Sequence, residues 1–159
     1  MGVDIVCGEK VFSCGYKRWS DFRIGVIQAT IRYIETVLKP TDLIIEENSH
    51  LKQLLEFVEL VHSEQADKDL DAFLSLMKTS KNEDYVHILD VFIHFGLGGL
   101  FALCNKTDCD GYYSVGNSVD ICDLFKKIRD IMDEKFPHWK QVRSVFREGI
   151  KQRKLVMVI

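Results

Sequence analysis

The chain has very few prolines and no long apolar run. Its two prolines, Pro40 and Pro137, leave long stretches in which helices can continue without interruption. No apolar run reaches the ~20 residues that cross a bilayer, because the longest candidate, 91–103, contains His94 and three glycines. The first residues lack the basic and apolar regions of a secretory signal. We therefore expect a cytoplasmic or nuclear protein that is not secreted and has no membrane partner.

Motifs of the common catalytic classes are also missing. There is no GxSxG elbow, and the glycines of 96–99 have neither the GxGxxG nor the Walker A spacing, so we expect them to serve packing. The five cysteines are an odd number and include no CxxC pair. Reduced thiols are therefore expected, and a zinc site is not. We expect no enzymatic activity and no cofactor.

Length and composition are those of an ordinary globular protein. The 159 residues are 47% hydrophobic and 28% charged, and one domain spanning 1–159 is the expectation. The net charge of -3 is unevenly distributed. From Lys135 onward there are seven Lys or Arg and a single Glu, so this segment carries +6 and the preceding 134 residues carry -9. Such asymmetry concerns partners and not the fold.

Hydrophobic periodicity predicts a mainly helical α+β fold with about six helices. These helices are expected over 17–38, 49–64, 66–77, 83–95, 117–136 and from Pro137 onward. The helix over 83–95 is apolar on more than one side and is therefore expected to be central. Asn117 or Ser118 is the expected N-cap of the fifth helix. The connector 42–48 contains Leu43-Ile44-Ile45, which is compatible with a short strand or a buried turn.

The two ends of the chain predict a small antiparallel sheet. Residues 3–15 have two short β-branched or apolar runs around Gly8-Glu9, which is typical of a hairpin. Residues 155–159 form a strand-like apolar run. Because an isolated hairpin is marginally stable, we expect this terminal strand to pair with it.

Arg23 stands among apolar neighbours on the first predicted helix. One interpretation is an arginine that binds an anion. The simpler interpretation is a side chain whose stem packs on the core while its charged head remains in water.

The loop over 105–114 combines turn-forming residues with metal-capable ones. Asp108, Asp110 and Gly111 have the spacing of the middle of a calcium loop, but Lys106 and Asn117 stand where its end carboxylates belong. The simpler interpretation is a turn in which both aspartates bond backbone amides and Gly111 is left-handed. No metal is therefore expected, and a divalent cation held by Asp108 and Asp110 is the alternative. The candidate residues of the loop are Asp108, Cys109, Asp110, Gly111 and Ser114.

Part of this loop also resembles a known family. Residues 107–114, Thr-Asp-Cys-Asp-Gly-Tyr-Tyr-Ser, are similar to the His-Ser-Asp-Cys-Asp-Gly-x-[Trp/Tyr]-[Ser/Thr] loop of small uncharacterised proteins familiar from bacteria. Those proteins tend to begin Met-Gly-[Leu/Val/Ile]-Asp and to end in Phe-x-x-Gly-[Leu/Ile] and a short apolar run, as residues 146–150 and 155–159 do here. Their aromatic pattern before the first helix is matched by Tyr16, Trp19, Phe22 and Arg23. The family has no assigned activity, so the resemblance implies kinship of fold and no mechanism.

A row of basic residues lies along the last predicted helix. Its members recur at three- and four-residue spacings, which places them in one stripe on the helix: Lys140, Arg143, Arg147, Lys151 and Lys154. The functional interpretation is a docking surface for an acidic protein or a polyanion. Nucleic acid is one such polyanion, although no aromatic residues lie between the basic ones to stack on bases. The simpler interpretation is a solvated face that balances the acidic helices.

Two functional hypotheses therefore remain open. The preferred one is a non-enzymatic interaction protein that contacts an unidentified acidic protein or polyanion through the basic C-terminal helix. The alternative is a small metal-dependent or thiol enzyme centred on the loop from Asp108 to Gly111, with Cys109 as the candidate thiol.

Overall fold

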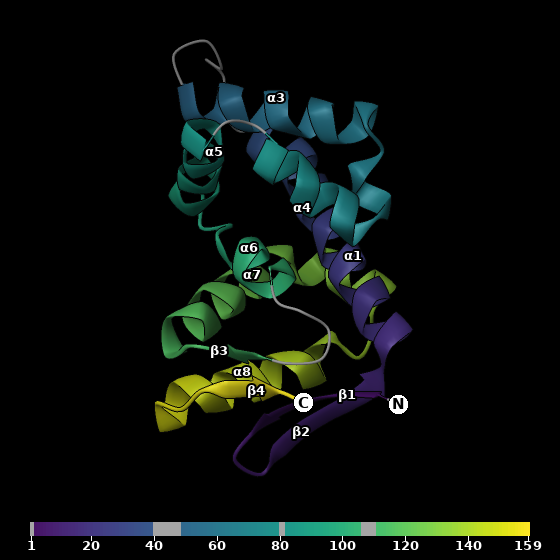
Figure 1. Cartoon of the computed structure of the whole chain (residues 1–159), viewed down its shortest axis with the longest axis vertical. Helices are drawn as coiled ribbons and strands as arrows, with labels where there is room; N and C mark the ends of the chain where they lie inside the picture. The colour runs from purple at the N-terminus through teal and green to yellow at the C-terminus, as the bar shows by residue number, and fades with distance from the viewer. Residues whose placement is uncertain (1, 40–48, 80–81, 106–110) are drawn as a thin grey trace.

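The computed structural model describes residues 2–39, 49–79, 82–105 and 111–159 (Figure 1). The connector 42–48 with its Leu43-Ile44-Ile45 segment lies outside these ranges. The described residues form a mainly helical α+β structure with a four-stranded antiparallel sheet, which confirms the predicted fold class. None of the helices among these residues is both long and apolar enough to cross a membrane.

The sheet is built from both ends of the chain, as predicted. Strands β1 (Gly2–Cys7) and β2 (Lys10–Gly15) form the hairpin, and Gly8 takes the positive φ of 58° that its turn requires. The C-terminal strand β4 (Val156–Val158) pairs with β1. A further strand, β3 (Gly111–Tyr113), pairs with the other edge of β4, so the order is β2-β1-β4-β3. Sequence reasoning placed these three residues in a loop and missed β3.

The helices stack above the sheet in Figure 1, with α8 nearest to it. The first helix continues through one π-helical turn, Ile34–Leu38. The α-helices are α1 (Tyr16–Tyr33), α3 (Ser49–Ser63), α4 (Leu70–Thr79), α5 (Asn82–His94), α6 (Gly99–Cys104), α7 (Val115–Lys135) and α8 (Trp139–Gln152).

Three of the predicted helix starts are wrong, and one of them is that of the last helix, which begins at Trp139 instead of Pro137. The predicted helix from Ala66 is instead a 3-10 turn, Ala66–Lys68, followed by the extended residue Asp69. The carboxylate of Asp69 accepts a hydrogen bond from the backbone amide of Ala72 (2.9 Å) and so caps α4. Helix α7 begins at Val115, earlier than the predicted caps Asn117 and Ser118.

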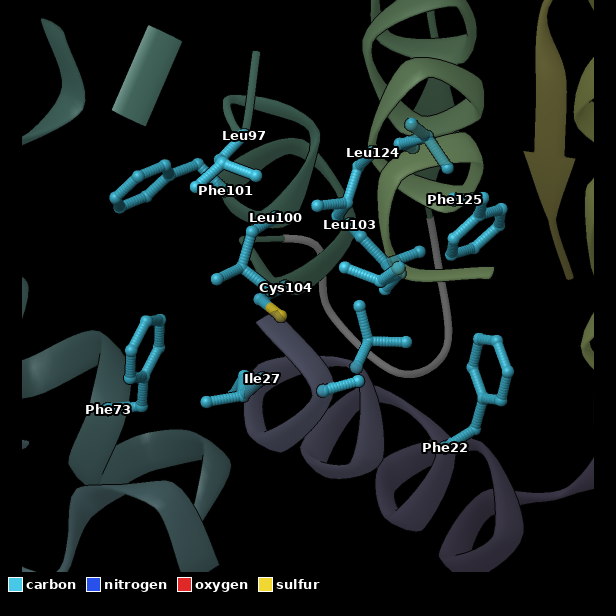
Figure 2. Close-up of a cluster of buried hydrophobic side chains, with 14 of the residues drawn as sticks. Phe22, Ile27, Phe73, Leu97, Leu100, Phe101, Leu103, Cys104, Leu124 and Phe125 are labelled. Atoms are coloured by element: carbon cyan, nitrogen blue, oxygen red, sulfur yellow. The ribbon is translucent and has the colours of Figure 1, made fainter. Parts of the chain in front are cut away.

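The centre of the core lies where α1, α6 and α7 meet. Figure 2 shows Ile27 of α1, Leu100 of α6 and Leu124 of α7 in one cluster of buried side chains where the three helices approach one another, and all three side chains are fully buried. Gly99 allows this approach, because a Cβ there would lie 2.3 Å from the Asp120 carbonyl oxygen. The interpretation of the 96–99 glycines as packing residues is therefore confirmed at Gly99.

Helix α5 does not hold the central position predicted for it. It packs on α3 and α4, away from the sheet (Figure 1). Among its described side chains Val91 and Phe92 are buried, but Ile93 is exposed. Apolar residues on several sides of this helix therefore do not indicate burial on all sides.

Candidate functional site

Helix α8 presents a buried face and a basic face. Its buried residues are Trp139, Val142, Val145, Phe146 and Gly149, which face α7 and the sheet. Lys140, Arg143, Arg147 and Lys151 recur at three and four residues on the opposite part of the helix surface, and we call them the basic stripe. Lys140, Arg147 and Lys151 are exposed and Arg143 is half-buried. The structure thus places four of the five predicted basic residues on one helix face.

Lys154 does not extend this stripe. The helix ends at Gln152, and Arg153 adopts a left-handed conformation with φ of 52°. The backbone amides of Arg153 and Lys154 donate to the carbonyl oxygens of Ile150 and Gly149, at 3.3 and 3.0 Å. This is a Schellman ending, which turns the chain toward β4. The prediction that Lys154 shares the helical stripe is therefore wrong.

The N-terminal end of the stripe is held in place by Trp139 and Asp133. The indole Nε1 of Trp139 donates to Asp133 Oδ1 at 2.7 Å, and Lys140 Nζ lies 3.7 Å from the same oxygen. The guanidinium carbon of Arg143 lies 4.7 Å from the centroid of the Trp139 ring. Such stacking orients an arginine while it leaves the charge available. Sequence reasoning missed Asp133, since only the turn between α7 and α8 brings it to Trp139.

The C-terminal part of the stripe is not ion-paired to any residue that the structure describes. Within the described part of the chain, Arg147 and Lys151 form no ion pair, and neither does Lys154. Next to Lys140, a hollow of about 340 Å³ lies between β2 and α8, and Lys10 contributes a second cation to its lining. This side of the molecule therefore offers several cations that are free to meet an anionic surface.

Cys122 of α7 lies near the stripe but is a poor nucleophile. Burial raises the pKa of its thiol to about 11, although the charges of Arg147 and Arg143 act to lower it. The thiol therefore stays protonated at neutral pH, and a protonated thiol does not attack carbonyls or bind metals readily.

Residues 106–110, half of the candidate loop, lie outside the described residues. Asp108, Cys109 and Asp110 belong to that part, so the alternative of a metal or thiol site there is neither supported nor opposed. Gly111 is the first residue of β3 and has the positive φ, 156°, that was predicted for it and that favours glycine. Among the residues that the structure describes, no three His, Cys, Asp or Glu side chains gather closely enough to hold a metal ion.

Ser114 has a structural partner. Its hydroxyl accepts a hydrogen bond from the Asn117 amide (3.0 Å), and the Asn117 side chain accepts one from the Ser114 amide (3.1 Å). This reciprocal pair is a capping box at the start of α7. The spacing Ser-x-x-Asn indicates such a capping box. The sequence-based prediction chose Asn117 as a candidate N-cap, whereas the N-cap is Ser114.

Arg23 matches neither of its two interpretations in full. Its side chain is completely buried, so its head is not in water, and an anion in solution cannot reach it in this conformation. The guanidinium carbon lies 5.5 Å from the centroid of the Trp19 ring. Burial lowers the pKa of Arg23, and the neighbouring Tyr113 and Cys104 oppose that shift. Arg23 is therefore a core residue at the junction of α1, α6 and β3.

Comparisons with protein-family models, with curated proteins and with solved structures give no match for this chain. The resemblance of residues 107–114 to the bacterial loop family thus stays a prediction. The function has to be argued from the geometry of α8 and its surroundings.

Proposed function

We propose that the protein is a non-enzymatic interaction protein that binds an acidic partner through the basic stripe on α8. The observation that carries the proposal is the exposure of Arg147 and Lys151 without an ion pair to any described residue. Next to them, the guanidinium of Arg143 lies over the Trp139 ring. A stacked arginine beside exposed cations suits carboxylate or phosphate groups on a second surface.

The spacing of the stripe adds a physical argument. Arg143, Arg147 and Lys151 are successive i, i+4 neighbours on one helix. Each like-charge pair at this spacing destabilises a helix by roughly 0.2–0.5 kcal/mol. An acidic partner would relieve this repulsion on binding, whereas a merely solvated face would gain from alternating charges. The uneven charge of the chain, +6 from Lys135 onward, favours the same partner class.

Charge reversal on the stripe tests the proposal. We expect Arg147→Glu with Lys151→Glu to reduce the affinity for labelled poly-glutamate and for a DNA duplex at least tenfold, because electrostatic contacts dominate such binding. Comparing the two probes shows whether the partner class is an acidic protein or a nucleic acid. Both residues are exposed, so circular dichroism should show an unchanged fold.

The matched control carries the same change of charge elsewhere. Lys52→Glu with Lys68→Glu alters two exposed lysines on α3 and on the Ala66–Lys68 turn. It should bind both probes almost as the wild type does. Equal affinity of the stripe variant and this control would show that net charge, and not α8, governs binding, and the proposal would then be wrong.

A further inference from the structure

The sheet has one covered face and one outer face. Val3, Ile5 and Cys7 of β1 are buried on the covered face. Helix α8 packs on that side, where Phe146 contacts Tyr113 with ring centroids 5.1 Å apart. Because successive strand residues point to opposite faces, the residues between these buried positions belong to the outer face. Figure 1 shows the four strands together at one end of the molecule.

An apolar row crosses all four strands on this outer face. The strand registers pair Val6 with Val11, Val6 with Met157, and Met157 with Tyr112. Val11, Tyr112 and Met157 are 55%, 53% and 42% exposed. The row is thus continuous from the β2 edge to the β3 edge and faces outward.

The last strand extends the row into a patch. Leu155 and Ile159, which alternate with the buried Val156 and Val158, are 47% and 65% exposed. We call Val6, Val11, Tyr112, Leu155, Met157 and Ile159 the outer sheet face. Half-exposed side chains of this size together present on the order of 500 Å² of apolar surface, and patches of that extent are often functional.

The composition of the strands is unusual for a sheet with a solvated face. Antiparallel strands with one wet face normally alternate apolar and polar residues, whereas residues 155–159 are apolar throughout. Continuous apolar strands are typical of sheets that are covered on both faces. At the outer positions of β1 and β2, Asp4 is the single charged residue.

We propose that the outer sheet face is the interface through which two copies of this chain associate. A nearly uncharged apolar face is complementary to itself across a twofold axis, and little like-charge repulsion opposes the contact. Two sheets that pack face to face lie about 10 Å apart and bury their facing side chains as a β-sandwich does. The area of the apolar patch, together with that of the residues around it, approaches the ~800 Å² that each partner buries in a stable interface.

This association leaves the basic stripe accessible. Helix α8 covers the opposite side of the sheet, so a dimer formed through the outer sheet face would expose two basic stripes. The inference concerns the face of the sheet opposite to α8, and either proposal can fail without the other. Val11 also lines the hollow beside Lys140, so Met157→Lys separates the two surfaces more clearly than Val11→Lys does.

The oligomeric state tests this inference. We expect sedimentation equilibrium to give a dimer for the wild type, and monomers for Met157→Lys and for Val11→Lys, because a buried lysine would lose its hydration. Ile93→Lys is the matched control: Ile93 is 56% exposed on α5, and the same change there should leave the dimer intact.

Three outcomes would overturn the inference. They are a wild-type chain that is monomeric at every concentration measured, lysine variants that remain dimeric, and a monomer that instead binds phosphatidylcholine vesicles through the same residues. If the lysine variants do not fold, Met157→Thr provides the comparison, since threonine suits strands and introduces a polar group at the same position.

Discussion

Arg23, Cys104 and Tyr113 form a small polar group inside the core. All three are buried, and the Tyr113 hydroxyl donates to the Leu103 carbonyl oxygen at 3.1 Å. Burial raises the pKa of Cys104 to about 12, against an opposing effect of Arg23, and raises the pKa of Tyr113 as well. Both groups are therefore neutral at pH 7.

The Cys104 thiol predicts how stability depends on alkaline pH. Its pKa is higher in the folded protein than the ordinary 9.0, so its stabilising effect is complete below pH 9 and is lost as the pH rises toward about 12. We expect the free energy of unfolding in urea to fall across this window. In Cys104→Ala the fall should be smaller, since only Tyr113 of the two still contributes. A pH dependence identical to that of the wild type would contradict the assignment.

At the scale of the elements, the start of α7 depends on the Ser114–Asn117 capping box. We expect Ser114→Ala to lower the free energy of unfolding by about 1 kcal/mol, because the Asn117 amide loses its acceptor. Ser114→Asp should keep most of the stability, since aspartate caps equally well. Denaturant titrations of the two variants would decide this, and a loss in both would show that Ser114 contributes something other than a cap.

The contact between α6 and α7 depends on the missing side chain of Gly99. A Cβ there would lie 2.3 Å from the Asp120 carbonyl oxygen, which belongs to the backbone and cannot rotate away. We expect Gly99→Ala to destabilise the protein by about 2 kcal/mol, in the range of overpacked cores. Gly116→Ala is the control, because its nearest neighbour is the Ser114 hydroxyl at 3.7 Å. Similar melting temperatures for both variants would mean that the two helices can separate without cost.

Much of the element order could be predicted from the sequence, because it follows from local patterns. The hairpin, the terminal strand and the long helices have clear periodicity, and their existence is confirmed. Strand β3 could not be predicted in this way: three residues carry no period, and their partner β4 lies more than forty residues away. The end of α8 was also missed, since the left-handed position that glycine usually marks is occupied by Arg153.

In the candidate site, too, the features that depend on neighbouring residues could be predicted, and those that depend on residues far apart in the sequence could not. Helical spacing alone predicts the stripe from Lys140 to Lys151. Its anchoring by Asp133 and Trp139 depends on the turn between two helices, and the outer sheet face depends on the register of strands from both ends of the chain. Neither feature has a signature within one stretch of sequence.

At the scale of the whole molecule, two different surfaces lie on opposite sides of one sheet. Helix α8 separates the basic stripe from the covered face of the sheet, and the outer sheet face lies beyond the strands. One surface is charged and suits reversible contacts that weaken with salt, whereas the other is apolar and suits stable association.

The most direct test of this account is the affinity of the wild-type protein for poly-glutamate and for a DNA duplex, measured over a range of salt concentrations beside the Arg147→Glu, Lys151→Glu variant. The account predicts that wild-type binding to at least one probe weakens steadily with salt, and that the variant shows little binding at any salt concentration. Wild-type binding that is absent at low salt, or that the double charge reversal leaves unchanged, would contradict the central claim.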